Sequence, residues 1–324
     1  MSGRYEVELV PPDKAEEALA LLLRRYPPER RPRRREALLQ RLTNDRAIPL
    51  ELWQVVDRHP SSGKSACPRV VAAGLLEHQP GGTTMGSAPV VLNHRFLDAG
   101  ILLLRKWREA VRNQGRRVLQ ILAEDHLLGQ RQMLRQAGIP RLTSLLYMCC
   151  EVGESLEEPP WDGSPAKGGL FFEPLSDSPT TWSRLAAVVE KTYIGSLDCP
   201  EVSGLRTAEE TLTAYRLAGA WRADLWFIVR LQDQEIGCLL LGDRPTENCI
   251  ELVYMGLLPE YRGHGLGSRL VDKAKSITVQ LGRSRLVAAV DIRNWPAIRV
   301  YEQAGFYSVA RADVFQEIFP PSNK

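Results

Sequence analysis

The chain has 324 residues, of which 44% are hydrophobic and 25% are charged, and its formal net charge is +3. This length exceeds what one compact core supports and predicts two domains. No apolar run approaches the roughly 18 residues of a membrane span, and the N-terminus lacks an apolar signal core, so we expect a cytoplasmic protein without a membrane partner.

The six cysteines and five histidines are scattered along the chain. Their spacing matches no metal-binding or redox motif. We therefore expect reduced core thiols and no metal ion.

The first 150 residues predict an α/β domain in which strands and helices alternate. The expected strands are 5–10, 69–76, 88–92, 118–123 and 143–149. The expected helices are 13–23, 102–111 and 129–136, and residues 79–86 are expected to form a turn because they are rich in Gly and Thr.

Positive charge is concentrated in this first part, which carries 24 Lys+Arg against 15 Asp+Glu. The densest run is Arg30–Arg35. A basic patch can bind nucleic acid or an acidic carrier. No aromatic interleaving or known binding module accompanies this run, which favours a solvated helix face over nucleic acid and leaves the role of the run open.

Residues 151–169 are rich in Pro, Gly and acidic residues without periodicity, which indicates a linker. The second domain, 170–324, again alternates strands and helices. Its expected strands are 170–173, 223–230, 235–242, 250–257 and 285–290. Its expected helices are 182–193, one beginning at Thr207, one beginning at Ser268 and one beginning at Asn294.

A glycine-rich turn lies between the strand at 250–257 and the helix that follows, with the sequence Arg-Gly-His-Gly-Leu-Gly at 262–267. Glycines let the backbone take positive φ and approach a ligand closely. The free N–H groups and the dipole of the helix N-terminus favour an anion, so phosphate or pyrophosphate is the natural ligand.

The combination of Arg-x-x-Gly-x-Gly at 262–267 with Asn-x-x-Ala-x-x-x-Tyr-x-x-x-Gly-Phe at 294–306 resembles the paired signature of the GCN5-related N-acetyltransferase (GNAT) superfamily. With the strands before it, the resemblance covers about the last 155 residues. It implies a mixed, mostly antiparallel sheet flanked by helices, and acetyl-CoA as the acyl donor.

The resemblance also implies which residues bind acyl-CoA. The backbone amides of Arg262, Gly263, His264, Gly265, Leu266, Gly267 and Ser268 would hold the pyrophosphate. Leu257 would pair its backbone with the pantetheine arm, and Asn294 would hydrogen-bond that arm. His264 is expected to be exposed, and the Arg262 side chain is expected to be a solvated charge.

Two further residues are implied for the chemistry. Tyr301 would protonate the departing thiolate as the general acid, and Glu251 would accept the proton of the amine as the general base, directly or through water. A core tyrosine and a solvent-facing glutamate are the alternatives. Asp198 and Glu201 could attract an amine cation, although surface carboxylates of a loop are the favoured interpretation.

Overlaying the two halves at a shift of 167 positions places Gln136-Ala137-Gly138 on Gln303-Ala304-Gly305. This repetition predicts tandem GNAT folds, as in the layout of mycothiol synthase. In the first copy Phe96, Leu97 and Asp98 replace residues of the turn, and Leu134 and Leu127 stand at the positions of Tyr301 and Asn294. We therefore expect residues 1–150 to be a degenerate, non-catalytic copy.

The sequence thus predicts an acetyl-CoA-dependent N-acetyltransferase whose acceptor is a small-molecule amine. A protein amine is the main alternative, and a CoA-binding regulatory module without catalysis is another. The sequence alone leaves the acceptor, the acyl-chain length and the oligomeric state open.

Overall fold

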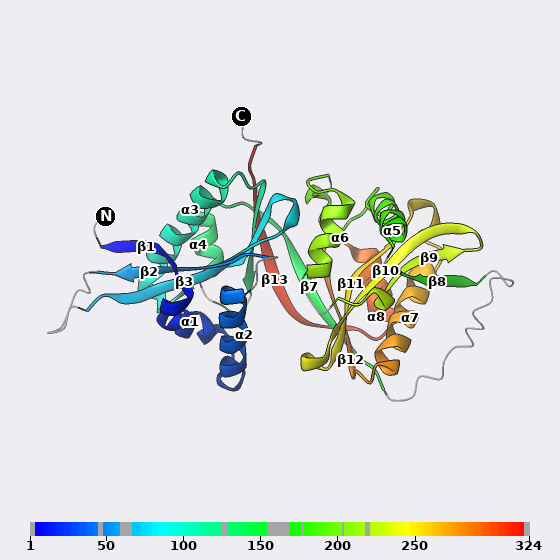
Figure 1. Cartoon of the computed structure of the whole chain (residues 1–324), viewed down its shortest axis with the longest axis horizontal. Coiled ribbons are helices and arrows are strands. Elements are labelled where there is room, and N and C mark those ends of the chain that lie inside the picture. Colours follow the sequence, from blue (N-terminus) through cyan, green and yellow to red (C-terminus); the bar gives the residue numbers. More distant parts are fainter. Residues whose placement is uncertain are drawn as a thin grey trace. The chain divides into compact units, whose positions relative to one another are not determined.

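The computed structural model describes residues 4–44, 48–58, 67–124, 127, 129–153, 169–176, 178–202, 204–217 and 221–320 (Figure 1). The chain forms two compact units. The described residues up to Leu142, together with those from Ala312 onward, make the first unit, and Thr143–Arg311 make the second.

The first unit is a sheet with a pair of helices on each face (Figure 1). Its strands are β1 (Tyr5–Val10), β2 (Leu50–Asp57), β3 (Arg69–His78), β4 (Thr83–Ser87), β5 (Val90–Val91) and β6 (Val118–Glu124), completed by the end of β13 (Tyr307–Ile318). Its helices are α1 (Glu16–Leu22), α2 (Arg31–Asn44), α3 (Leu97–Asn113) and α4 (Gln130–Gln136). Figure 1 shows α1 and α2 on one face of this sheet and α3 and α4 on the other.

The second unit has the same layout. Its strands are β7 (Arg141–Glu151), β8 (Leu170–Pro174), β9 (Trp226–Leu231), β10 (Gln234–Arg244), β11 (Cys249–Leu257) and β12 (Arg285–Asp291). Its helices are α5 (Pro179–Thr192), α6 (Ala208–Leu217), α7 (Leu266–Gln280) and α8 (Trp295–Gln303). Helices α5 and α6 cover one face of the sheet, and α7 and α8 cover the other (Figure 1).

The two sheets repeat one pattern of strand pairing. The order is β1-β2-β3-β4-β6-β13 in the first unit and β8-β9-β10-β11-β12-β7 in the second. In both, the one parallel contact is between the fourth and fifth strands, β4 with β6 and β11 with β12. The expected mixed, mostly antiparallel fold is confirmed. A shift of 167 residues places β6 on β12 and the end of α3 on the end of α7.

The sixth strand of each sheet comes from the other half of the sequence. Strand β7 follows the elements of the first copy but pairs antiparallel with β12. Strand β13 ends the second copy, but from Ala312 onward it pairs with β6. The compact units therefore divide at Leu142 and Arg311 rather than at the expected linker 151–169, of which residues 154–168 lie outside the described part.

Buried side chains show why this exchange is stable. Phe315 and Phe319 of the chain end pack in the core of the first unit with Trp107. Met148 and Cys150 of β7 pack in the core of the second unit. Each exchanged strand thus completes the apolar layer of the sheet that it joins.

The sequence missed two elements of the first unit. Strand β2 was not predicted, and residues 83–87 form strand β4 instead of a turn. Most of the basic run lies in helix α2, where Arg33–Arg35 are exposed, as the favoured helix-face interpretation predicted. Pairing with β6 stabilises β4 although its sequence, Thr-Thr-Met-Gly-Ser, contains a glycine. Tertiary pairing outweighs weak local propensity here.

Candidate functional site

The glycine-rich turn has the open geometry of an anion site. Gly263 and Gly265 have φ of 78° and 75°, a region that side chains rarely adopt. A Cβ added to either would meet no heavy atom within 4 Å. Gly267 differs, because a Cβ there would lie 3.5 Å from Val300, an ordinary van der Waals contact between α7 and α8.

The N–H groups of this turn are available for a ligand. Within the described part of the chain, those of residues 263–268 have no hydrogen-bond acceptor, and no side chain caps α7. Arg262 differs from its neighbours, because its N–H donates to the carbonyl of Pro259 at 3.2 Å. Six successive N–H groups at a helix N-terminus fit the phosphates that the sequence predicted.

The Arg262 side chain is not a solvated charge, contrary to expectation. Its Nε donates to the carbonyl of Leu257 at 2.9 Å, its Nη1 to that of Ile194 at 2.8 Å and its Nη2 to that of Thr192 at 2.8 Å. Thr192 ends α5, where free carbonyls attract a cation. Arg262 therefore joins the end of β11 to the end of α5.

Strands β11 and β12 separate beyond their first residues. They pair from Cys249 to Leu252 with Arg285 to Ala288, although β11 continues to Leu257. A bulge lies at the point of separation, because Tyr254 faces Leu240 and Leu252 faces Leu241, which leaves Val253 without a partner on β10. The edge of β11 that leads to Leu257 can therefore receive an extended ligand.

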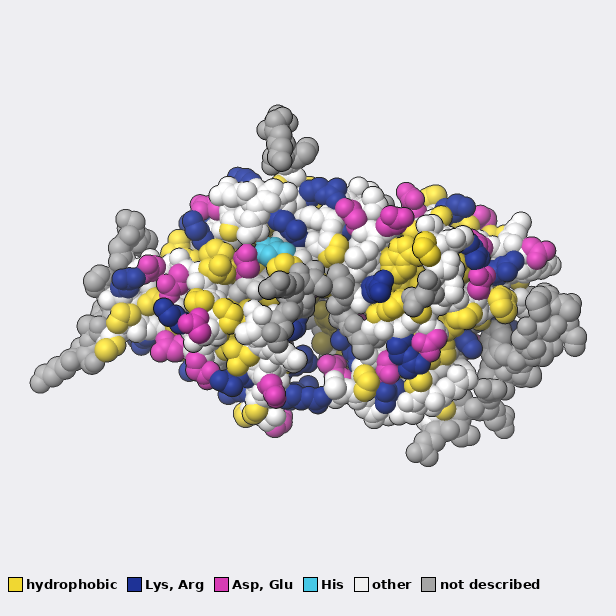
Figure 2. Space-filling view, viewed as in Figure 1, with side chains coloured by type: hydrophobic (Ala, Val, Ile, Leu, Met, Phe, Trp, Pro, Cys, Tyr) yellow, Lys and Arg dark blue, Asp and Glu magenta, His cyan; other side chains and the backbone are white. Residues whose placement is uncertain are grey.

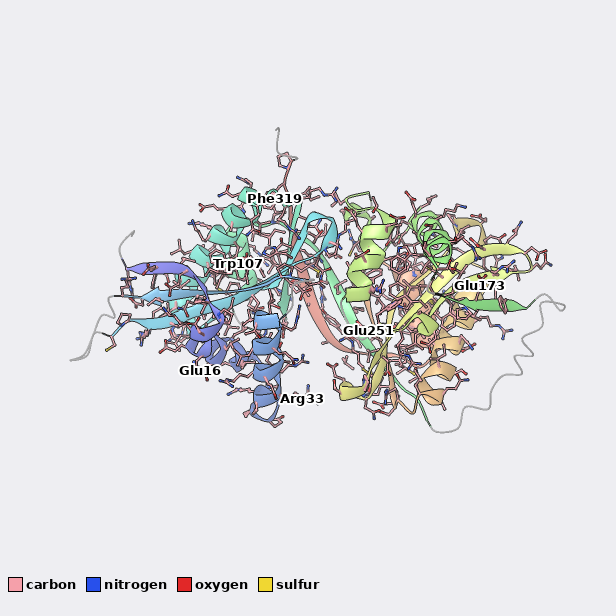
Figure 3. All side chains as sticks on the ribbon, viewed as in Figure 1. Glu16, Arg33, Trp107, Glu173, Glu251 and Phe319 are labelled. Atoms are coloured by element: carbon pink, nitrogen blue, oxygen red, sulfur yellow. The ribbon has the colours of Figure 1, made fainter. Side chains whose placement is uncertain are left out.

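Glu251 lies on β11 where the two strands are still paired, opposite Gly242 of β10 and Val287 of β12 (Figure 3). Partners across a ladder point to the same face, so Glu251 and Tyr254 share the face covered by α5 and α6. Arg244 forms an ion pair with the Glu251 carboxylate. An amine that approaches Glu251 must share this carboxylate with Arg244 or displace the guanidinium.

Tyr301 is a buried residue of α8, and its ring lies 5.2 Å from that of Phe306 between centroids. Burial, with a smaller contribution from the charge of Asp198, raises the pKa of Tyr301 well above its ordinary value of 10. Its hydroxyl is therefore protonated at neutral pH and can donate a proton. Asn294 accepts a hydrogen bond from the N–H of Ala297 at 3.4 Å as the N-cap of α8, which leaves its amide NH₂ for a ligand.

Asp291, at the end of β12, organises a polar cluster that the sequence missed. Its buried carboxylate accepts hydrogen bonds from Thr143 Oγ1 at 2.7 Å, from the N–H of Cys199 at 3.1 Å and from Arg293 Nη2 at 2.7 Å. Burial alone would raise the pKa of Asp291, but bonds from Arg293, Thr143 and Cys199 outweigh it and lower the pKa to about 2. A charged residue directly after a buried strand was the available signal.

The two carboxylates expected near the acceptor belong to the same cluster. Asp198 Oδ1 accepts a hydrogen bond from the N–H of Asp291 at 3.0 Å. Glu201 forms a bidentate ion pair with Arg293. Both side chains are therefore engaged by the chain itself.

Three tyrosines, also missed in the sequence, gather under the face that carries Glu251. Tyr254 is 5.6 Å from Tyr193 and 6.1 Å from Tyr215 between ring centroids, and its hydroxyl lies 2.8 Å from Thr192 Oγ1. Burial raises the pKa of Tyr193 to about 12 and those of the other two well above 10. They present neutral phenols near the Glu251 face.

The equivalent turn of the first unit is filled by its own side chains. Phe96 is buried there, with the Arg69 guanidinium 5.0 Å from its ring centroid. Asp98 accepts a hydrogen bond from Tyr5 at 3.4 Å, and a Cβ on Gly100 would lie 2.2 Å from Met133 Sδ. Side chains of the first unit thus occupy the space that the glycines leave open in the second unit, and the non-catalytic role of the first copy stays a prediction.

Within the residues that the structure describes, no three His, Cys, Asp or Glu side chains are arranged to hold a metal ion. No helix in the described part of the chain is long and apolar enough to span a membrane.

Residues 193–306 match the model of the Acetyltransferase (GNAT) family. This segment contains the glycine-rich turn, Glu251, Asn294 and Tyr301. A stretch of 56 residues is 36% identical to a mycothiol acetyltransferase of Corynebacterium aurimucosum, and this match spans 17% of the chain and 18% of that relative.

Solved structures share the fold over nearly the whole chain. A GCN5-related N-acetyltransferase from Sphaerobacter thermophilus matches 98% of this chain and 96% of its own, with a TM-score of 0.67 and 15% identity. A tandem GNAT protein from the clavulanic acid biosynthesis pathway matches 98% of this chain and 100% of its own, with a TM-score of 0.57 and 17% identity. The tandem GNAT fold is therefore shared, and residues 193–306 are similar in sequence to the acetyltransferases of the GNAT family.

Proposed function

We propose that this chain, whose residues 193–306 belong to the acetyltransferase (GNAT) family, moves an acetyl group from acetyl-CoA to a primary amine by direct attack. The observation that carries the proposal is the row of N–H groups at residues 263–268, which lack acceptors in the described chain and lie between the end of β11 and the first turn of α7. A pyrophosphate there would direct an extended arm toward the gap between β11 and β12.

The cofactor supplies a thioester whose carbonyl is open to attack. The N–H groups of residues 263–268 would hold its phosphates, and the free edge of β11 near Leu257 and the amide of Asn294 would hold its arm. One lone pair of the Leu257 carbonyl oxygen is engaged by Arg262, and the other remains for a ligand donor.

A proton must leave the amine before it can act as a nucleophile, and we assign its removal to a Glu251 Oε atom, directly or through water. Tyr301 donates its Oη proton to the sulfur that departs as a thiolate. The raised pKa of Tyr301 means that the phenol is protonated at neutral pH, as a proton donor must be. The acceptor is proposed to be a small molecule.

The test is a calorimetric titration of acetyl-CoA into the full chain and into a Gly265→Asp/Gly267→Asp variant. A carboxylate beside the pyrophosphate repels it by about 1 kcal/mol per charge at 4 Å even in water, and by more where water is excluded. We expect one site in the wild type and none in the variant, and thiol release with an amine in the wild type. If the variant retains one equivalent, the first unit holds the cofactor and the assignment fails.

Binding without thiol release to any amine would instead favour a CoA-binding regulatory module. Tyr301 and Glu251 weigh against that alternative, because a sensor of CoA needs neither a general acid nor a general base.

A further inference from the structure

Residues 194–201 cross the open end of the second sheet. Near β11, the carbonyl of Ile194 is held by Arg262, which also holds Leu257. Near β12, Asp198 and Cys199 are both hydrogen-bonded to Asp291, the last residue of that strand. Since β11 and β12 pair only as far as Leu252 and Ala288, this segment spans the gap between their separated ends.

The acidic side chains of this segment already have hydrogen-bond partners within the chain. Arg293 shares its guanidinium between Glu201 and Asp291, and Asp198 accepts a backbone N–H bond. A polycationic acceptor would have to break these pairs before it could form its own. A ligand cation would therefore compete with Arg293 and with the N–H of Asp291 for these carboxylates.

Exposed apolar side chains border the same gap. Ile194 is 62% exposed and Leu197 is 41% exposed, and they lie on the crossing segment. Ile292 (38%) and Trp295 (64%) lie beyond Asp291, in a turn closed by a 2.8 Å bond from the N–H of Asn294 to the carbonyl of Asp291. Leu197 and Ile292 are each next in sequence to a residue of the Asp198–Asp291 hydrogen bond, so the two segments meet at these residues.

This clustering is not a general property of the surface. In the described part of the chain ten large hydrophobic residues are exposed, and four of them lie in these two short segments. Figure 2 shows hydrophobic side chains gathered on the viewed face of the second unit beside α5 and α6. Grouped apolar side chains at the mouth of a site are typical of a surface that binds an apolar ligand.

We infer that the acceptor is a hydrophobic primary amine, an arylalkylamine or alkylamine of small size. Its apolar part packs against Ile194, Leu197, Ile292 and Trp295, and its amine reaches between β11 and β12 toward Glu251. The neutral phenols of Tyr193, Tyr215 and Tyr254 on the Glu251 face suit the same ligand. The inference rests on the proposed acetyl transfer and names its substrate class.

The test is a panel of amines given to the full chain with saturating acetyl-CoA, with thiol release as the readout. Tryptamine, phenethylamine and hexylamine represent the hydrophobic class. Glucosamine, spermidine and a lysine-containing peptide represent polar, polycationic and protein acceptors. We expect kcat/KM for the best hydrophobic amine to be at least about tenfold higher than for any of the three polar acceptors. Glucosamine is less basic than the hydrophobic amines, so a larger fraction of it is unprotonated at neutral pH. A preference for the hydrophobic amines over glucosamine therefore cannot come from basicity.

Two variants test the location. Leu197→Asn and Trp295→Gln should each raise KM for the best hydrophobic amine about tenfold, while the Kd of acetyl-CoA measured by calorimetry stays unchanged. Leu9→Asn, at a leucine that is 52% exposed on β1 of the first unit, is the matched control and should change neither value.

A kcat/KM for any polar acceptor that exceeds the value for the best hydrophobic amine overturns the inferred substrate class. The proposed acetyl transfer would still stand. An unchanged KM in both variants overturns the location. If acetyl-CoA binds but no amine of the panel releases thiol, the proposed function fails, and the inference fails with it.

Discussion

The Arg262 guanidinium holds the carbonyl of Leu257 at the end of β11 and the carbonyl of Thr192 at the end of α5. The sequence suggested that Arg262 acts through its backbone. Its side chain instead connects the proposed phosphate site to the segment that follows α5. Arginine suits this place because its guanidinium has five N–H donors and can serve several carbonyls at once.

Arg262→Ala should therefore destabilise the second unit, because three carbonyls lose a charged donor. We expect a loss of about 1–3 kcal/mol in the free energy of unfolding, measured by urea denaturation, and weaker acetyl-CoA binding. Arg299→Ala, at an exposed arginine of α8, is the control and should stay within about 0.5 kcal/mol of the wild type. Equal stability of both variants would contradict the anchoring role of Arg262.

Asp291 should make stability depend on pH in the acid range. Its pKa is about 2 in the folded chain against an ordinary 3.8, so the folded state favours the charged form. The stabilisation, about 2 kcal/mol, is fully present above pH 4 and is lost as the pH falls toward 2.

Asp291→Asn should remove this dependence. The free energy of unfolding of the variant should lie below that of the wild type at pH 7, and the difference should shrink between pH 4 and pH 2. Asp233→Asn, at a fully exposed aspartate, should follow the wild-type curve. A constant difference between Asp291→Asn and the wild type over this pH range would refute the assignment.

Tyr301→Phe should lower kcat by about 10²–10³ without changing the Kd of acetyl-CoA, because it removes a proton donor and little volume. The pKa of Tyr301 is raised well above 10, so Tyr301 should keep its proton as the pH approaches 10. The wild-type rate should therefore not decline in this range because of Tyr301. Tyr307→Phe, at an exposed tyrosine, is the control. A variant with unchanged kcat would make Tyr301 a core residue and nothing more.

Glu251→Gln should lower kcat/KM at pH 7 by about 10²–10⁴, because the amine loses its proton acceptor. Activity should rise with pH as more of the free amine forms in solution. Glu173→Gln is a matched control, since Glu173 is also ion-paired on a strand of the same sheet, on edge strand β8 (Figure 3). If the two variants show the same kinetics, the base lies elsewhere.

Phe315→Ala should destabilise the first unit by about 3–5 kcal/mol, although the residue follows the second copy in sequence. Phe315 is fully buried among Trp107 and its neighbours, whereas Ile318 of the same strand is exposed. Hydrogen exchange should show faster exchange for the amides of β6 in Phe315→Ala and no change in Ile318→Ala. Unaltered protection of β6 would mean that β13 does not support this sheet.

The sequence by itself predicted the glycine-rich turn and most elements of the second unit, although it missed strand β13 and assigned β7 to the first copy. The residues at 262–267 and 294–306 act through local rules that a sequence displays: glycines that permit positive φ, a free helix N-terminus and an asparagine cap. The repeat at 167 residues likewise indicated two copies of one fold, because each copy keeps its punctuating glycines.

Only the tertiary structure decided which strands complete which sheet and what the charged side chains do. The residues of β7 and β13 could form a strand in either sheet, and the exchange depends on their pairing with β12 and β6. Glu251 pairs with Arg244, which is 7 residues away, and Glu201 pairs with Arg293, which is 92 residues away. Arg262 reaches Thr192 across 70 residues. Hydrogen bonds and ion pairs over such separations depend on the packing of helices and strands, which residue spacing along the chain does not encode.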